Sequence, residues 1–329
     1  MDMDELRHAI NNFSFDRCKG GNQGFNRILI QLFGWLGHGM SSFINTCVYI
    51  WQDGEYQSWA KAERNFTWER IEHKLTNNIT LVDNRGLSTM DSYEIGEIYA
   101  QLGNLLPLGQ AVEWTKGFKL VNRILKSEKL VKYSDFIVPV YVHSARRTIY
   151  PEEMNELENV FKAARRLTGV CPIVVLTHKS SGNVTDTEKM FRDMGVDKIF
   201  LFENCTSEDH VKTRGRHEEV LKFLYEVIKD VQFAVEHQPQ DPVKESIERK
   251  NFVMSYINKC ELQAKQEEIE VQRALERVRL EKKKEEEEEE EEIKRQKERE
   301  RQDQAMEEEL QAEQERLRKK EKKKWKLFR

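Results

Sequence analysis

The sequence predicts an open, mostly parallel α/β sheet with helices on both faces, followed by a long charged C-terminal helix or coiled coil. Short apolar runs rich in β-branched and aromatic residues recur along the chain, separated by stretches with apolar residues every three or four positions. Continuous apolar runs suit strands buried on both faces, and their alternation with helices is typical of a parallel sheet. After Pro242 the chain contains no proline or glycine, and helix-forming residues dominate.

The sheet is expected to contain five strands, at residues 27–33, 78–83, 135–142, 172–177 and 198–204. Helices are expected at residues 41–51, 152–167 and 217–233. The second of these helices begins beside Pro151, and proline favours the first position of a helix. Together the elements predict one domain over residues 25–235, long enough to bury a substantial core, after an N-terminal segment of residues 1–24.

Composition narrows the class of protein. Charged residues make up 34% of the chain, against roughly 25% in an average globular protein, and the excess lies mostly in the C-terminal part. No apolar run is long enough to form a transmembrane helix, and the acidic start MDMDELRHAI lacks the pattern of a secretory signal. The five cysteines are widely spaced without a C-x-x-C pair, so neither a disulfide framework nor a zinc site is expected. These features favour a reducing, cytoplasmic location.

The C-terminal part is expected to contain a hinge at residues 236–256 and a charged helical tail at residues 257–329. Opposite charges recur at four-residue spacing around a block of eight glutamates, as expected for a solvated helix. Four apolar positions suggest a seam that faces a partner: Ile269, Ala274, Val278 and Leu280. Self-association through a coiled coil and a spacer helix without a partner both fit this pattern.

The last fourteen residues, RLRKKEKKKWKLFR, carry nine positive charges and one negative charge, with aromatic and aliphatic residues between them. Basic charge with apolar anchors suits an anionic membrane surface or a protein partner, or keeps an exposed terminus solvated. Nucleic acid could meet the same basic end but is the less favoured partner.

A glycine-rich stretch, GWLGHGMSS at residues 34–42, follows the first predicted strand and opens the first predicted helix. Its glycines and Ser41 have the spacing of a phosphate-binding loop, G-x-x-x-x-G-K-[ST], with Met40 in place of the lysine. At such a junction, free backbone N–H groups and the positive end of the helix meet the phosphates. Ser41 would be a magnesium ligand. The residues expected to contact nucleotide are Gly34, Gly37, His38, Gly39, Met40, Ser41 and Ser42.

A second motif, LVDNRGL at residues 81–87, ends the second predicted strand. Asp83 is placed to hold magnesium through a bound water, and Gly86 to offer its backbone N–H to the terminal phosphate. Between the two motifs, Thr67 and Thr76 are both candidates for a further magnesium contact.

A third motif, VVLTHKSSG at residues 174–182, resembles the base-recognition sequence of GTP-binding proteins, N-K-x-D or its variant T-[KH]-x-D. Thr177 and His178 match the variant, but Ser180 stands where the aspartate would accept hydrogen bonds from guanine N1 and N2. At the end of the last predicted strand, FLFENCTS offers Asn204, Cys205 and Thr206 as candidate supports for the base.

In combination these motifs resemble a P-loop GTPase over about residues 25–235. GHGMSSFINT, DNRGL and ENCTSEDH are most similar to the interferon-induced protein 44 family, a degenerate GTPase-like group. The methionine in GHGMS also resembles one branch of the immunity-related GTPases. The resemblance implies GTP or GDP with Mg²⁺ as cofactors, and a role in vertebrate innate immune defence.

Met40 bears directly on catalysis. The lysine of a phosphate loop bridges the β- and γ-phosphates and stabilises the transition state, which a thioether cannot do. His38 and Arg85 are the nearest residues that could replace its charge, and no catalytic residue is identified. The sequence therefore predicts a guanine-nucleotide-binding, switch-like protein with GDP favoured and with weak or absent hydrolysis. The alternative is a non-catalytic pseudo-GTPase scaffold that acts through its C-terminal helix.

Overall fold

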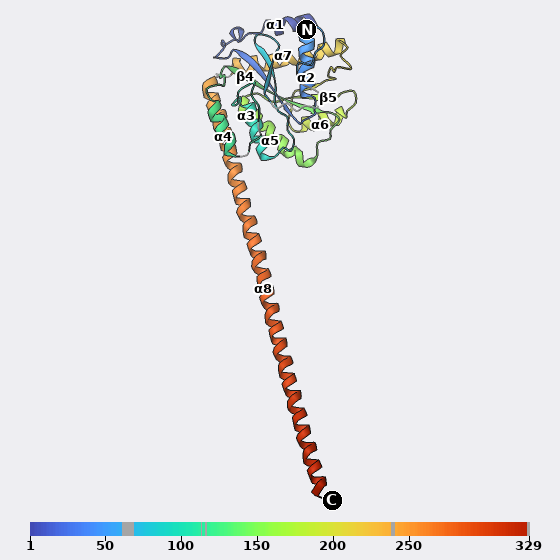
Figure 1. The fold of residues 1–329 in the computed structure, drawn as a ribbon. Coiled ribbons are helices and arrows are strands. Elements are labelled where there is room, and N and C mark those ends of the chain that lie inside the picture. The colour runs from blue at the N-terminus through green and yellow to red at the C-terminus, as the bar shows by residue number, and fades with distance from the viewer. Residues whose placement is uncertain (61–68, 113, 116, 238–240, 328–329) are drawn as a thin grey trace. The chain divides into compact units, whose positions relative to one another are not determined.

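The structure is a computed structural model that describes residues 1–60, 69–112, 114–115, 117–237 and 241–327, with side chains up to residue 320. The chain divides into two units, Met1–Glu261 and Leu262–Arg329. The first unit contains the sheet and its covering helices, and the second is a continuous helix (Figure 1).

The described residues form one six-stranded sheet with the strand order β2-β3-β1-β4-β5-β6. The strands are β1 (Arg27–Gly34), β2 (Ile71–Lys74), β3 (Ile79–Asp83), β4 (Asp135–Ser144), β5 (Ile173–Thr177) and β6 (Ile199–Leu201). All neighbours are parallel except β2, which pairs antiparallel with β3. The predicted α/β fold and its five apolar strands are therefore confirmed, and β2 is an additional strand at the edge.

Two hydrophobic layers cover the sheet, and the alternation of side chains along β1 separates them. Ile28, Ile30 and Leu32 pack into one layer, whereas Phe33 packs into the other. The first layer includes α1 (Met3–Asn11), α2 (Met40–Gln52) and α7 (Arg214–His237). The second includes α3 (Ser92–Leu102), α4 (Phe118–Ser127), α5 (Pro151–Thr168), α6 (Val184–Asp193) and the start of α8 (Pro242–Leu327).

The N-terminal segment belongs to the first of these layers. Helix α1 begins at a capping box in which the Asp2 side chain and Glu5 exchange hydrogen bonds with each other's backbone. Leu6 and Ile10 are buried, and α1 packs against α7 (Figure 1). A 3₁₀ turn, η1 (Phe15–Arg17), then adds Phe15 to the core before β1.

A buried arginine organises the polar interior beside β1 and β3. The Arg70 guanidinium is fully buried and donates to Asn84 Oδ1 at 2.9 Å and Gln31 Oε1 at 3.1 Å, and to the Leu106 carbonyl. Asn84 in turn donates to the Leu32 carbonyl at 2.9 Å. Burial lowers the pKa of Arg70 to about 9, so the group stays charged near neutral pH. This network fixes the end of β3, where the candidate site begins.

The structure differs from the sequence expectation at residues 236–256, where a hinge was expected. Helix α7 continues to His237, and α8 already begins at Pro242, a position that suits proline. Asp241 accepts hydrogen bonds from the backbone of the first turn of α8. Arg249 and Val253 are buried, and Arg249 Nε donates to the Leu167 carbonyl at 2.9 Å. The first turns of α8 are therefore packed against the globular unit.

The second unit confirms the predicted long helix. Its large apolar side chains up to residue 320 are exposed, including Ile269 (48%) and Val278 (51%). Ion pairs at four-residue spacing join Lys283 to Glu287 and Arg295 to Glu291. Across the described residues, no helix is long and apolar enough to cross a membrane.

We expect Val253→Ala to lower the free energy of unfolding by about 2 kcal/mol, because it opens a cavity beneath the start of α8. The matched control is Val271→Ala, whose side chain is 59% exposed, against 0% for Val253. Its effect is expected to stay within about 0.5 kcal/mol. Urea unfolding of the full chain measures both, and equal effects would contradict the packing of α8 described here.

Candidate functional site

Four loops meet at the carboxyl edge of the sheet. They follow β1 (residues 35–39), β3 (84–91), β5 (178–183) and β6 (202–213). Parallel strands end at the same edge, so the predicted motifs are brought to one side of the molecule. The chain leaves β1 for α2 in one layer, whereas β3 and β4 lead to α3 and α5 in the other. The β1–α2 loop therefore lies at the point where ligands bind in open α/β sheets.

The β1–α2 loop, residues 35–39, presents an uncapped helix end. Gly39 precedes α2 with φ 87°, and no side chain caps the helix. The first helical bond runs from Phe43 N to the Gly39 carbonyl at 2.8 Å, so the N–H groups of Met40, Ser41 and Ser42 have no partner within the helix. Such a helix end attracts anions through its N–H groups and its dipole.

The ends of β5 and β6 hold this loop from the other side. Thr177 Oγ1 donates to the His38 carbonyl at 2.8 Å, and Asn204 Nδ2 donates to the Gly39 carbonyl at 3.2 Å. A Cβ on Gly39 would lie 3.1 Å from Asn204 Nδ2, a tight contact, and the positive φ of Gly39 is strained for any other residue. The structure thus brings Thr177 and Asn204 to the β1–α2 loop, where their side chains bind its backbone.

Ser41 and Asp83 come together as the sequence predicts. Ser41 Oγ donates to Asp83 Oδ2 at 2.8 Å, and Asp83 is 1% exposed. A hydroxyl and a carboxylate oxygen beside an anion-binding helix end fit Mg²⁺, which takes few protein ligands and completes its shell with water and phosphate. Over the described part of the chain, no cluster of three His, Cys, Asp or Glu side chains offers a metal site.

Met40 fills the space between the first two loops. Its side chain is 7% exposed, and a Cβ on Gly86 would lie 2.9 Å from Met40 Cε. The same loops pair through their backbones: Leu36 N donates to the Leu87 carbonyl at 2.9 Å, and Leu87 N donates to the Gly34 carbonyl at 2.8 Å. At the sequence position that a phosphate-binding lysine would occupy, this chain therefore has a methionine that makes an apolar contact with the second loop.

Neither of the two nearby basic residues replaces the lysine charge. Burial, followed by the neighbouring His143 and Arg147, lowers the pKa of His38 to about 3, so its ring is neutral near pH 7. Arg85 donates to the Val112 carbonyl at 2.7 Å, and its guanidinium lies 4.3 Å from the centre of the Trp114 ring. The Arg85 side chain therefore contacts the segment before α4.

The turn after β5 contacts a carboxylate from the loop after β6 that the sequence motif did not indicate. His178 adopts φ 58° and is half-buried, and burial lowers its pKa. Ser180 N donates to Glu203 Oε2 at 2.8 Å. Glu203 stands directly before Asn204 in the FLFENCTS stretch, but only the long-range pairing of the two loops reveals its position.

Of the two threonine candidates for a further magnesium contact, Thr76 lies at the wrong edge of the sheet. It is in the turn between β2 and β3, where Asn78 N donates to its Oγ1 at 3.1 Å. That turn precedes β3 and so lies opposite the site. Thr67 lies outside the described residues.

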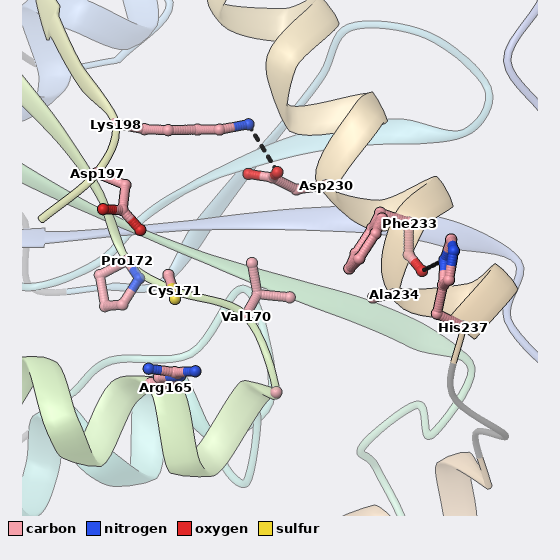
Figure 2. Close-up of a pocket in the computed structure, with 11 residues that line it drawn as sticks. Arg165, Val170, Cys171, Pro172, Asp197, Lys198, Asp230, Phe233, Ala234 and His237 are labelled. Atoms are coloured by element: carbon pink, nitrogen blue, oxygen red, sulfur yellow. Dashed lines mark hydrogen bonds and ion pairs between the residues drawn. The ribbon is translucent and has the colours of Figure 1, made fainter.

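A pocket of about 270 Å³ lies at the opposite, amino edge of β5 and β6 (Figure 2). Figure 2 shows that Cys171 and Pro172, which precede β5, line this pocket together with Phe233 and His237 of α7. Lys198 in this pocket pairs with Asp230 at 2.6 Å and with Glu226 at 2.9 Å. None of the site residues predicted from the sequence lines this pocket.

The fold and the site define an open α/β protein with an anion-attracting helix end beside a serine–aspartate pair. No protein-family model and no curated protein matches the sequence. Two variants of the protein SsGBP are similar over 64% of this chain, at 15% and 14% identity and TM-scores of 0.28 and 0.30. The matches span 57% and 58% of those chains.

The Thermus thermophilus protein ttk003000868 is similar over 69% of this chain and 36% of its own, at 13% identity and a TM-score of 0.33. This chain thus matches less than two thirds of each solved structure. Similarities this distant carry no argument about what the chain does.

The buried histidines predict an acid-sensitive fold. Burial lowers the pKa of His143 to about 4, and its ring lies 4.8 Å from that of His38. Both rings bind protons more readily in the unfolded chain, so stability is full above about pH 6.5 and falls as the pH drops. Between pH 7.5 and 5.5, each of these two histidines should lower the free energy of unfolding by about 1.4 kcal/mol.

Urea unfolding at pH 7.5 and 5.5 measures this loss. The double variant His38→Gln/His143→Gln should show a smaller pH dependence than the native chain, whereas His8→Gln, at an exposed position, should not differ from it. An unchanged pH dependence in the double variant would contradict the neutral state of the pair.

Proposed function

We propose that this chain is a guanine-nucleotide-binding, switch-like protein of the P-loop GTPase type, with weak or absent hydrolysis. The observation that carries the proposal is the 2.8 Å hydrogen bond between Ser41 and Asp83 beside the uncapped end of α2. The two residues lie 42 positions apart: Ser41 is in the first turn of α2, and Asp83 is the last residue of β3. A scaffold that binds no nucleotide would need neither this pair nor an uncapped helix end.

The β1–α2 loop would bind the phosphates through backbone N–H groups at the start of α2. When bound, Mg²⁺ would be held by Ser41, by Asp83 and by phosphate oxygens, and it would neutralise charge on the phosphates. Gly86 lies beside Met40, close to the same helix end. Thr177 and Asn204 would act by holding the loop in place.

Weak hydrolysis follows from the charges around the loop. Met40 offers no ammonium group, His38 is neutral, and Arg85 is bound elsewhere. Transition-state charge on the γ-phosphate would therefore lack the stabilisation that a lysine supplies. GDP would be favoured over GTP, because only GTP carries the γ-phosphate whose negative charge the missing lysine would meet.

We extend the proposal to the interferon-induced protein 44 family, on the resemblance of GHGMSSFINT, DNRGL and ENCTSEDH. The first two stretches supply the Ser41–Asp83 pair, and the third supplies Asn204. A role in innate immune response and a cytoplasmic location come with this family and are part of the same proposal.

The second candidate function is a pseudo-GTPase scaffold, and the contact of Met40 with Gly86 favours it. This contact and the pairing of Leu36 with Leu87 close the two loops without a ligand. A scaffold would act through α8, whose exposed Val271, Leu275 and Val278 could support self-association. Its basic end would then meet an anionic membrane or a protein partner.

Calorimetric titration of the nucleotide-stripped full chain with GDP, GTP and ATP in magnesium tests the first candidate. We expect micromolar GDP binding, weakened about tenfold or more by Ser41→Ala because a magnesium ligand is lost. Gly39→Val should abolish binding, because φ 87° and the contact with Asn204 exclude a branched side chain. Ser92→Ala, at an exposed position outside the site, is the matched control. Absence of heat with every nucleotide, from folded protein, would leave the scaffold.

Met40→Lys separates the two candidates from another direction. In a nucleotide site the restored ammonium should raise GTP affinity about tenfold or more. Without nucleotide the same variant should be less stable, since it buries a charge in an apolar contact. Calorimetry and urea unfolding measure these effects. Met306→Lys, at a side chain that is 61% exposed, is the control and should change neither. A destabilised variant with unchanged GTP affinity would favour the scaffold.

A further inference from the structure

We propose that the carboxylate of Glu203 recognises guanine, in place of the aspartate that is missing at Ser180. This assignment rests on the proposed nucleotide-binding function and adds to it the group that would select the base. A hydroxyl at Ser180 is a weak acceptor for the two donors on guanine, N1–H and the 2-amino group. Guanine recognition would need a carboxylate beside Ser180, and the loop after β6 supplies that of Glu203.

The turn after β5 is tied to the end of β6 by backbone and side-chain contacts. Lys179 N donates to the Phe202 carbonyl at 3.3 Å, and Ser180 N donates to Glu203 Oε2 at 2.8 Å. The turn itself is closed by a bond from Gly182 N to the His178 carbonyl at 2.9 Å. These contacts bring the Glu203 carboxylate to the backbone of the residue that occupies the aspartate position.

Glu203 also lies next to the phosphate end of the candidate site. The following residue, Asn204, donates to the Gly39 carbonyl at 3.2 Å, and Cys205 N donates to Thr46 Oγ1 of α2 at 2.8 Å. The segment 203–205 thus connects the β1–α2 loop to the turn at Ser180. A nucleotide whose phosphates bind at the start of α2 would have to place its base beside this segment.

The carboxylate is ionised and keeps acceptor capacity. Burial acts to raise the pKa of Glu203, but hydrogen bonds from Ser180 and nearby positive groups lower it below its usual value. Ser180 is exposed and Glu203 is half-buried, so solvent reaches this point. A carboxylate has about four lone-pair positions, and the N–H and the hydroxyl of Ser180 take two of them. The others can accept both guanine donors, neither of which adenine presents on that edge.

A purely structural role for Glu203, as a brace for the turn, makes a different prediction. A brace would change stability but not the choice of base. Xanthine distinguishes the two roles, because it keeps N1–H and carries a carbonyl oxygen where guanine has its 2-amino group. An amide side chain can accept from N1–H and donate to that oxygen, whereas a carboxylate would repel it.

The experiment is calorimetric titration of the full chain and of Glu203→Gln with GDP, xanthosine diphosphate and ADP in magnesium. The native chain should prefer GDP. Glu203→Gln should bind GDP about 30-fold or more weakly and prefer xanthosine diphosphate, because a hydrogen bond to a charged group is replaced by one that suits xanthine. Glu208→Gln, at an exposed position in the same loop, is the matched control and should keep the native preference. Thermal unfolding confirms that each variant is folded.

The outcomes separate this inference from the function on which it rests. No binding of any nucleotide by the native chain would overturn both. GDP binding with the same base preference in the native chain and in Glu203→Gln would overturn the Glu203 assignment alone. Addition of Ser180→Asp to Glu203→Gln should restore the preference for GDP, since it returns a carboxylate to the same point. Failure of this rescue, in a folded variant that still binds nucleoside diphosphates, would also overturn the assignment.

Discussion

The burial of β1 on both of its faces is the constraint on which the rest of the structure depends. Ile28, Ile30 and Leu32 must be covered from one side and Phe33 from the other, so the chain needs a helical layer on each face. The chain leaves β1 for α2 in one layer and then leaves β3 and β4 for the opposite layer. The glycine-rich loop after β1 is therefore placed where the two layers diverge, and the N-terminal end of α2 is left without a side-chain cap.

Much of the fold could be predicted because its buried strands are short, continuous apolar runs. Strand β2 could not, since its sequence IEHK lies at the edge of the sheet and alternates between half-buried and exposed positions. The start of α8 could not be predicted for a different reason. Pro242 indicates a break as readily as a helix start, and only the burial of Arg249 and Val253 shows that the following residues pack on the globular unit.

The candidate site divides in the same way. The meeting of Gly39, Ser41 and Asp83 could be predicted, because each lies at or soon after the end of a parallel strand and such strands bring these positions to one edge. Glu203 could not, because its position depends on how two loops distant in sequence pack against each other. The packing of Met40 against Gly86 is likewise a contact between two loops, which a local motif cannot indicate.

The charges around the β1–α2 loop determine what kind of nucleotide site this could be. Lys179 is paired with Glu219, and Arg147 is paired with Glu153 while it lies 4.1 Å from the centre of the Trp35 ring. His38 is neutral. Over the described part of the chain, these basic groups near the loop are thus neutral or already partnered within the protein. The start of α2 adds a positive field of its own, so phosphate binding would depend largely on backbone N–H groups and on a cation held by Ser41 and Asp83. Affinity in such a site would fall steeply without magnesium, since no side-chain ammonium group would then oppose the phosphate charge.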